Sequence, residues 1–102
     1  MLKIKPNCER CNADLPANSQ QAFICSYECT FCENCVKNIL ANVCPNCGGG
    51  FQRRPIRPQK AYRTNISLAF QPASTIRVNT TYTDAEIKHF SEAIVGTAPE
   101  RR

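Results

Sequence analysis

The residues best suited to chemistry in this chain are its eight cysteines, which all fall between residues 8 and 47. Their spacing is C-x2-C-x13-C-x3-C-x2-C-x2-C-x8-C-x2-C. A C-x2-C turn places two thiolates on one metal, and a tetrahedral zinc site takes four. The sequence therefore predicts two Zn²⁺ ions. Their ligands are Cys8, Cys11, Cys25, Cys29, Cys32, Cys35, Cys44 and Cys47.

Two pairings of the ligands fit this spacing. In a sequential arrangement the first four cysteines bind one zinc and the last four bind the other. In a cross-braced arrangement the ligand pairs alternate along the chain. The eight residues between the sixth and seventh cysteines favour the cross-brace, because Val36, Ile39 and Leu40 have helical periodicity. A helix of that length carries the chain about 12 Å, from one site to the other. We therefore expect site 1 to contain Cys8, Cys11, Cys32 and Cys35, and site 2 to contain Cys25, Cys29, Cys44 and Cys47.

Other uses of the cysteines fit the sequence less well. The chain has no apolar run that resembles a secretory signal or a membrane span, so we expect a reducing cytoplasm, where clustered cysteines favour metal over disulfides. The run from Cys29 to Cys35 partly matches a ferredoxin pattern, but its fourth spacing does not. A thiol redox role would need a βαβ pattern that is absent. Four cysteines close each site, and His89 stands alone, so we expect neither an enzyme nor a small-molecule substrate.

The segments around the cysteines predict a small, metal-stabilised α+β fold. Phe23 and Ile24 indicate a short strand, and Glu33–Asn42 indicates a short helix. Thr83 and Glu86 form a capping box for a C-terminal helix over residues 84–95. Two β-prone stretches, 66–70 and 75–81, predict a hairpin. We expect a double-zinc module at 1–50, a basic proline-rich arm at 51–63, and a hairpin and helix at 64–102 that pack on the module.

The basic residues gather in the second half of the chain. Residues 1–50 carry four basic and four acidic side chains, and residues 51–102 carry nine and four. Loading eight thiolates with two zinc ions gives the first half a net charge of about −4. The arm could therefore lie against the module, or it could bind nucleic acid, with Phe51 and Tyr62 as stacking residues. The candidate phosphate contacts are Arg53, Arg54, Arg57, Lys60 and Arg63.

The chain resembles two known families. The cysteine spacing, including the proline of Cys44-Pro45, looks like an all-cysteine RING-type finger, which implies the cross-brace; LIM modules have a similar ligand count but are sequential. More closely, the chain resembles a bacterial family called domain of unknown function 1272. That resemblance implies a bacterial zinc protein and carries no activity. It rests on Lys5–Cys8 (KPNC), Asp14–Pro16 (DLP), Ile24–Cys32 (ICSYECTFC), Cys44–Gly49 (CPNCGG), Arg53–Pro58 (RRPIRP) and Pro72–Thr75 (PAST).

A ubiquitin ligase is the enzyme that the RING resemblance raises, and the sequence disfavours it. RING ligases usually carry an aliphatic residue between the first two ligands, where this chain has Glu9 and Arg10. Many also carry Trp between the sixth and seventh ligands and Arg after the last, whereas this chain has no Trp and has Gly48. Fold analogy alone does not establish activity. We therefore predict a cytoplasmic, non-catalytic zinc protein whose partner is a protein, with nucleic acid as the alternative.

Overall fold

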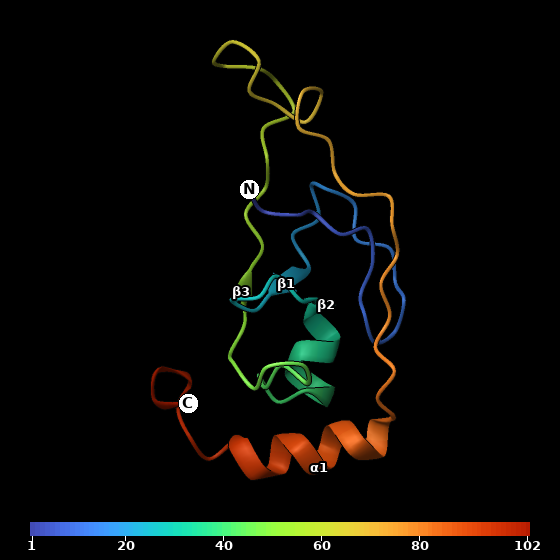
Figure 1. Cartoon of the computed structure of the whole chain (residues 1–102), viewed down its shortest axis with the longest axis vertical. Helices are drawn as coiled ribbons and strands as arrows, with labels where there is room; N and C mark the ends of the chain where they lie inside the picture. The colour runs from blue at the N-terminus through green and yellow to red at the C-terminus, as the bar shows by residue number, and fades with distance from the viewer.

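A computed structural model describes the whole chain, residues 1–102. The molecule measures 47 × 27 × 18 Å. At its centre lies an antiparallel sheet in the order β2-β1-β3 (Figure 1). A long helix, α1, crosses one end of the molecule, and a loop projects from the other. The elements are β1 (Ala22–Ile24), β2 (Thr30–Cys32), η1 (Cys35–Ile39), β3 (Gln52–Arg53), α1 (Asp84–Ile94) and η2 (Pro99–Arg101). None of the helices is both long enough and apolar enough to span a membrane.

The core lies between the sheet, η1 and α1. Phe31 of β2 packs edge to face on Phe51, with ring centroids 5.5 Å apart. Leu40 and Ile87 join this cluster from the end of η1 and from α1. Four of the eight cysteines belong to the same cluster. A chain of this size buries only a small apolar core. The packing of that core therefore depends on the sites that hold the sulfurs.

The local elements predicted from the sequence are present. Strand β1 contains Phe23 and Ile24, and it pairs with β2 and β3. The helix predicted at 33–42 is η1, a short π-helical segment; Ala41 and Asn42, with φ of 51° and 58°, end it. Helix α1 begins at the predicted capping box. The backbone N–H of Glu86 donates to Thr83 Oγ1 at 3.2 Å, and the N–H of Thr83 donates to Glu86 Oε1 at 3.0 Å. The α+β class is therefore confirmed.

The predicted hairpin between residues 66–70 and 75–81 is wrong. Only an isolated bridge between Arg63 and Ile66 forms in this region. Residues 67–71 instead make a turn, in which the backbone N–H groups of Phe70 and Gln71 donate to the Ser67 carbonyl. The β-prone composition of both stretches was therefore a local preference that the tertiary structure did not use.

The second stretch lies along the N-terminal segment, which explains why the hairpin does not form. The backbone N–H of Ser74 donates to the Ile4 carbonyl at 2.9 Å, and that of Thr80 to the Glu9 carbonyl at 2.6 Å. Between them, the buried side-chain amide of Asn7 donates to the Val78 carbonyl and accepts from its N–H. The N-terminal segment thus takes up backbone groups of Val78 and Thr80 that a hairpin would have paired. Residues 74–80 thus lead the chain from the projecting loop to α1.

Candidate metal centres

The eight cysteines gather into two groups that follow the cross-braced order. All are free thiols in the structure. In the first group the four sulfurs lie within 4.8 Å of one another, and Cys11 Sγ is 3.7 Å from Cys32 Sγ. The edge of a ZnS₄ tetrahedron with 2.3 Å bonds is about 3.8 Å, so the separation of Cys11 Sγ and Cys32 Sγ matches such an edge, and the four sulfurs are close enough together to share one ion. The group consists of Cys8, Cys11, Cys32 and Cys35.

The second group is less tightly closed. Cys25, Cys44 and Cys47 have their sulfurs within 4.8 Å of one another. Cys29 lies beside this triplet: burial raises the pKa of its thiol, Asn46 lowers it, and Cys25 raises it further. Its partners are thus those of the second group. A metal ion here would draw the fourth sulfur inward, and Cys29 is the residue placed to supply it.

The first and the last C-x2-C pairs of the chain, Cys8–Cys11 and Cys44–Cys47, sit on the same kind of turn. The N–H of Asn12 donates to the Cys8 carbonyl at 3.0 Å, and the N–H of Gly48 donates to the Cys44 carbonyl at 2.7 Å. Asn12 and Gly48 each follow the second cysteine of their pair and have φ of 62° and 79°. Glycine and asparagine are the residues that adopt this left-handed conformation most easily. The sequence therefore encodes both turns locally.

Backbone and side-chain donors already point at several sulfurs. The N–H of Cys35 donates to Cys32 Sγ at 3.5 Å, and the N–H of Gly49 to Cys47 Sγ at 3.4 Å. Arg10 Nη1 donates to Cys35 Sγ at 3.5 Å. Such outer contacts orient metal ligands and stabilise their thiolate form. They are arranged for negatively charged sulfurs.

Without a metal, burial opposes ionisation of the inner thiols. It raises the pKa of Cys35 and of Cys44, although Arg10 lowers the former and the N–H groups around Asn46 lower the latter. At exposed Cys11 burial also raises the pKa, but the Ala13 N–H and the neighbouring thiols lower it by more. A metal cation replaces the protons of such thiols. The donor set therefore suits a thiophilic cation that supplies the missing positive charge.

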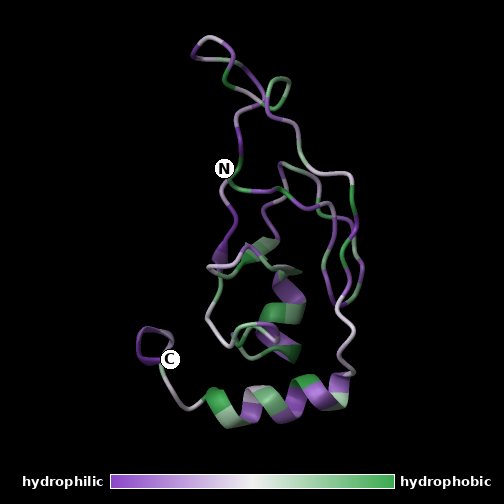
Figure 2. Ribbon diagram, in the orientation of Figure 1, coloured by the Kyte–Doolittle hydropathy of each residue, from purple (hydrophilic) through white to green (hydrophobic).

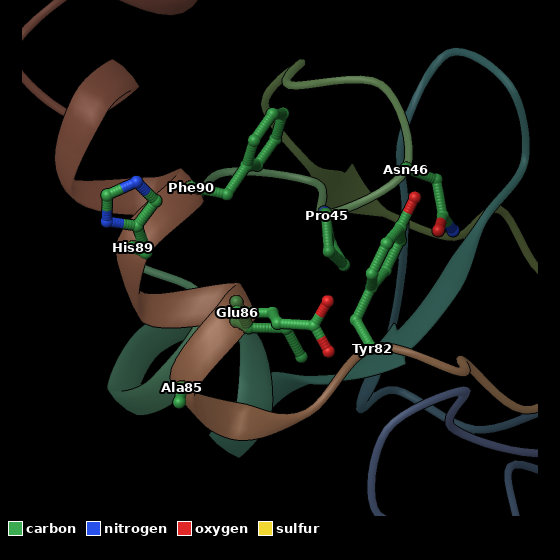
Figure 3. A pocket seen from close by; sticks show the side chains of 8 residues that line it. Pro45, Asn46, Tyr82, Ala85, Glu86, His89 and Phe90 are labelled. Atoms are coloured by element: carbon green, nitrogen blue, oxygen red, sulfur yellow. The ribbon is translucent and has the colours of Figure 1, made fainter.

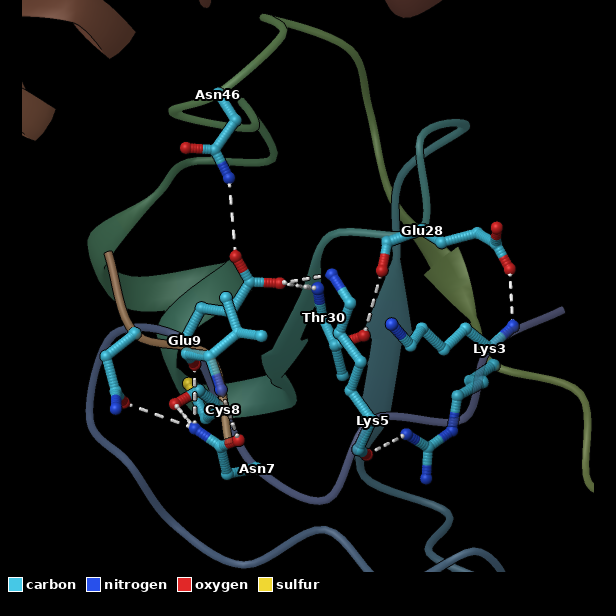
Figure 4. Close-up of polar contacts among 11 residues, drawn as sticks. Lys3, Lys5, Asn7, Cys8, Glu9, Glu28, Thr30 and Asn46 are labelled. Atoms are coloured by element: carbon cyan, nitrogen blue, oxygen red, sulfur yellow. Dashed lines mark hydrogen bonds and ion pairs between the residues drawn. The ribbon is translucent and has the colours of Figure 1, made fainter. Parts of the chain in front are cut away.

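A buried carboxylate connects the two groups (Figure 4). Glu9, which lies between the first two cysteines, is only 3% exposed. Its Oε2 accepts from the Thr30 N–H at 2.6 Å and from Lys5 Nζ at 3.3 Å. Its Oε1 accepts from Asn46 Nδ2 at 3.4 Å, in the turn that carries the last two cysteines. In the sequence, Glu9 stood out only because RING ligases usually have an aliphatic residue at that position, and its structural role was missed. The one signal for that role was a charged residue between the two cysteines of a C-x2-C turn.

Helix α1 contacts a residue beside each group of cysteines, one near each end of the helix. Arg10, which contacts Cys35, also donates to both carboxylate oxygens of Asp84 in the first turn of α1, at 3.0 and 2.7 Å. At the other end of the helix, Ile94 and Phe90 cover Gly48; a Cβ at Gly48 would lie 3.3 Å from Ile94 Cδ1. The helix therefore covers the positions before the second ligand and after the last one.

A groove opens between α1 and the last cysteine turn (Figure 3). It has a volume of about 550 Å³. Pro45 lies between Phe90 and Tyr82, which are 38% and 47% exposed, and Glu86 points toward the opening. The sequence predicts that this helix packs on the module. Its position opposite Pro45 could not be read from the sequence.

The structure divides the five candidate phosphate contacts of the basic arm into anchored and exposed side chains. Arg54 is 2% exposed and donates to the carbonyls of Lys5, Leu15 and Pro16. Arg57 donates to the carbonyls of Leu2 and Gln71, both at 2.6 Å.

The other three candidate phosphate contacts have exposed side chains. Of the two candidate stacking residues, Phe51 and Tyr62, one is not available. Arg53 lies over the Phe23 ring and 3.8 Å from Glu33, with about half of its side chain exposed. Lys60 and Arg63 are exposed and form no ion pair. The candidate stacking residue Phe51 is wrong, because its ring is buried against Phe31.

Comparisons with known proteins agree with the cysteine-rich part of this description. The model of a family described as "Protein of unknown function (DUF1272)" matches residues 1–57, which include all eight cysteines. An uncharacterized protein of Rhizobium meliloti (strain 1021) is 50% identical over 78 residues, which is 76% of this chain and 86% of that protein. No solved structure matches the chain. The projecting loop and α1 lie beyond the residues that the family model matches.

Proposed function

Because this chain belongs to the DUF1272 family of proteins of unknown function, we propose a function from its own residues. It is a non-catalytic protein-interaction module held together by two structural Zn²⁺ ions. The observation that carries the proposal is the grouping of the sulfurs into two sets, one of four within 4.8 Å of one another and one of three with Cys29 beside it. Cysteines clustered as metal ligands suit a reducing compartment, and we propose that the protein is cytoplasmic.

The ligand chemistry supports a structural role for the zinc. Catalytic zinc sites keep a position for water and usually employ histidine or carboxylate ligands. Here four sulfurs are available for each ion. The buried carboxylate between the first two ligands, that of Glu9, is committed to Thr30, Lys5 and Asn46. Zinc bound in this way stabilises the fold and polarises no substrate. Iron is the metal that the same thiolates could bind instead, and its cluster would colour the protein.

The position of α1 argues against a ligase. The residues at which RING ligases differ from this chain are contacted by the helix: Arg10 is paired with Asp84, and Gly48 lies under Ile94. Ile87 fills the core beside η1. A conjugating enzyme that approached this face would meet α1. We therefore propose no ubiquitin-transfer activity.

The groove beside site 2 is the surface we propose for the protein partner. It is lined by the exposed rings of Tyr82 and Phe90 and by Pro45, with the Glu86 carboxylate at its edge. Aromatic side chains of this kind dominate the energetics of protein interfaces. The matching partner is a short segment with an apolar side chain for the groove and a basic residue for Glu86.

The first experiment measures metal and fold together. Native mass spectrometry of protein purified without added metal should show two zinc ions per chain, with no visible absorption. Cys29→Ser should lose one ion and the cooperative unfolding transition, since metal binding supplies folding free energy. Ala98→Ser, at an exposed site, serves as the matched control. Retention of two tightly bound zinc ions and a cooperative transition in Cys29→Ser would show that the proposed ligand set is wrong.

The second experiment tests the groove. Zinc-loaded protein immobilised through its N-terminus should retain a partner in fixed stoichiometry at moderate salt. Tyr82→Ala and Phe90→Ala should release that partner, whereas Ile76→Ala, at a residue 67% exposed elsewhere, should not. Purified partner should then bind the wild-type protein directly. A partner that all three variants bind equally would place the interface elsewhere.

A further inference from the structure

The loop that projects from the end opposite α1 is built rather than loose. We call residues 58–71 the tip loop (Figure 1). The N–H of Leu68 closes it by donating to the Pro58 carbonyl at 2.9 Å. The side chain of Gln71 accepts from the Ser67 N–H at 3.2 Å and donates to the Asn65 carbonyl at 2.9 Å. Arg57 ties its base to the body of the molecule through Leu2 and Gln71. The backbone is therefore held by its own hydrogen bonds.

The outer side chains of the tip loop contribute little to that construction. Tyr62 is 77% exposed, and Ile66 and Phe70 are 56% and 54% exposed. Lys60 Nζ lies 5.5 Å from the centroid of the Tyr62 ring. Figure 2 shows hydrophilic and hydrophobic residues interleaved in this loop. Large apolar side chains that are exposed together on one ordered segment commonly mark an interaction site.

The charge around the tip loop points to an anionic ligand. Residues 34–83 contain no acidic residue, and two of their seven basic residues, Lys60 and Arg63, lie in the tip loop itself. Lys60 and Arg63 form no ion pair. The acidic side chains of the chain come from its first 33 residues and from Asp84 onward. A negatively charged ligand can thus approach the tip without meeting an acidic neighbour in the same segment.

We propose that the tip loop binds single-stranded nucleic acid. The exposed rings of Tyr62 and Phe70 stack on bases, and Lys60 and Arg63 contact the phosphates. Only a single strand presents base faces to a protein side chain, and stacking on aromatic rings tolerates any base. The Lys60 ammonium occupies one face of Tyr62, which leaves the other for a base. This site goes beyond the proposed protein-binding groove and lies at the opposite end of the molecule (Figure 1).

The order of residues at the apex favours nucleic acid over a lipid surface. Residues 59–65 read Gln-Lys-Ala-Tyr-Arg-Thr-Asn, so the apex is charged and polar apart from one ring. A loop that inserts into lipid would carry its aliphatic residues at the apex and its cations behind them. Here Ile66 and Phe70 follow the cations. The site also differs from the set expected from sequence, because Arg54 and Arg57 are committed to backbone carbonyls.

The expected binding is weak and moderately dependent on salt. Two phosphate contacts on a single strand give a slope of about −1.4 in a plot of log K against log salt. A fourfold rise in salt should then weaken binding about sevenfold. Loss of one stacked base should weaken it by about fivefold or more, which is the low end of the effect of removing a stacking ring in single-strand binders.

The test uses zinc-loaded full-length protein and a fluorescein-labelled oligo(dT) of about 12 nucleotides, followed by anisotropy at two salt concentrations. Tyr62→Ala and the double variant Lys60→Glu with Arg63→Glu should each weaken binding by at least about fivefold. Ile76→Ala and Lys88→Glu are the matched controls; both residues are exposed and lie outside the tip loop. Neither control should change the affinity by more than about twofold. Zinc content, measured for every variant, shows that the module is intact.

Several results would overturn the proposal. They are the absence of oligonucleotide binding at low salt, binding that Tyr62→Ala leaves unchanged, and binding that Lys88→Glu weakens as much as the double variant does. A parallel arm offers vesicles containing phosphatidylserine. Sedimentation with these vesicles, without binding of the oligonucleotide, would assign the tip loop to a lipid surface. Because none of these measurements involves the groove, failure here leaves the protein-binding proposal standing.

Discussion

Replacement of Arg54 is the sharpest test of whether the basic arm at 51–63 stabilises the fold or binds a ligand. The guanidinium is 2% exposed and donates to the carbonyls of Lys5, Leu15 and Pro16 at 2.8, 3.3 and 3.0 Å. Its Nε finds no partner, and burial lowers its pKa. The side chain thus joins two segments of the first half of the chain, around Lys5 and around Leu15 and Pro16, to the residue that follows β3. Arg54→Met keeps the aliphatic stem and removes the donors.

The magnitude follows from the hydrogen bonds. Bonds to a charged group contribute about 1.5 kcal/mol each at the low end, or about 4.5 kcal/mol for three. Arg54→Met also removes the cost of burying a guanidinium, which offsets part of that loss. We therefore expect a loss of about 3 kcal/mol in the free energy of unfolding, or roughly 150-fold in the equilibrium constant.

Arg53→Met is the matched control. Arg53 lies next in sequence, but its side chain is 55% exposed, 3.8 Å from Glu33 and 5.5 Å from the centroid of Phe23. An exposed ion pair and an exposed cation–π contact together contribute about 1 kcal/mol or less. Arg53→Met should therefore cost no more than about a third of what Arg54→Met costs.

The assay is urea unfolding followed by circular dichroism at a fixed excess of zinc, because ligand concentration changes apparent stability. An unchanged m-value would show that both variants unfold from the same compact state. The reasoning is refuted if Arg54→Met stays within about 0.5 kcal/mol of the wild type, which is less than the net value of one ordinary hydrogen bond. It is also refuted if Arg53→Met costs as much as Arg54→Met.

Three further predictions concern the helix, the last turn and the metal. Thr83→Ala should destabilise the protein by about 1 kcal/mol through loss of the N-cap, measured by thermal unfolding. The hydrogen bond from the Thr83 N–H is the main cause that lowers the pKa of Glu86 in the folded protein. The ionised Glu86 therefore stabilises the fold above its ordinary pKa of about 4.3, and this contribution is lost as the pH falls through the lower pKa of the folded state. A stability that does not change with pH below about 5 would contradict this prediction. Gly48→Ala should destabilise by about 1–2 kcal/mol, because it places a side chain at φ 79° and 3.3 Å from Ile94; an unchanged melting temperature would refute that contact. Acid should release zinc and unfold the module together, since burial raises the pKa of Cys35 and of Cys44 in the metal-free chain and protons then compete for the thiolates. A zinc-indicator dye and circular dichroism should report the same midpoint pH. Release of zinc from a chain that stays folded would show that the metal is not structural.

Much of the candidate site could be predicted from sequence because its determinants are local. The C-x2-C pairs and the left-handed residues Asn12 and Gly48 that follow two of them lie within a few positions of each other. The helical periodicity after Cys35 separates the two groups of sulfurs, and the sulfurs assemble in the alternating order that it indicates. The capping box at Thr83 is equally local and was found.

Only the tertiary structure determined which distant residues the basic arm and residues 75–81 contact. Arg54 reads as one of several basic residues in an arm, yet it is buried because carbonyls about 40 to 50 positions earlier in the chain converge on it. Residues 75–81 have the composition of a hairpin strand, but their neighbours are the N-terminal segment and Asn7, more than 70 residues away. Sequence patterns record the preferences of neighbouring residues. The partner of a given backbone group or charged side chain depends on how the whole chain packs around the two cysteine groups.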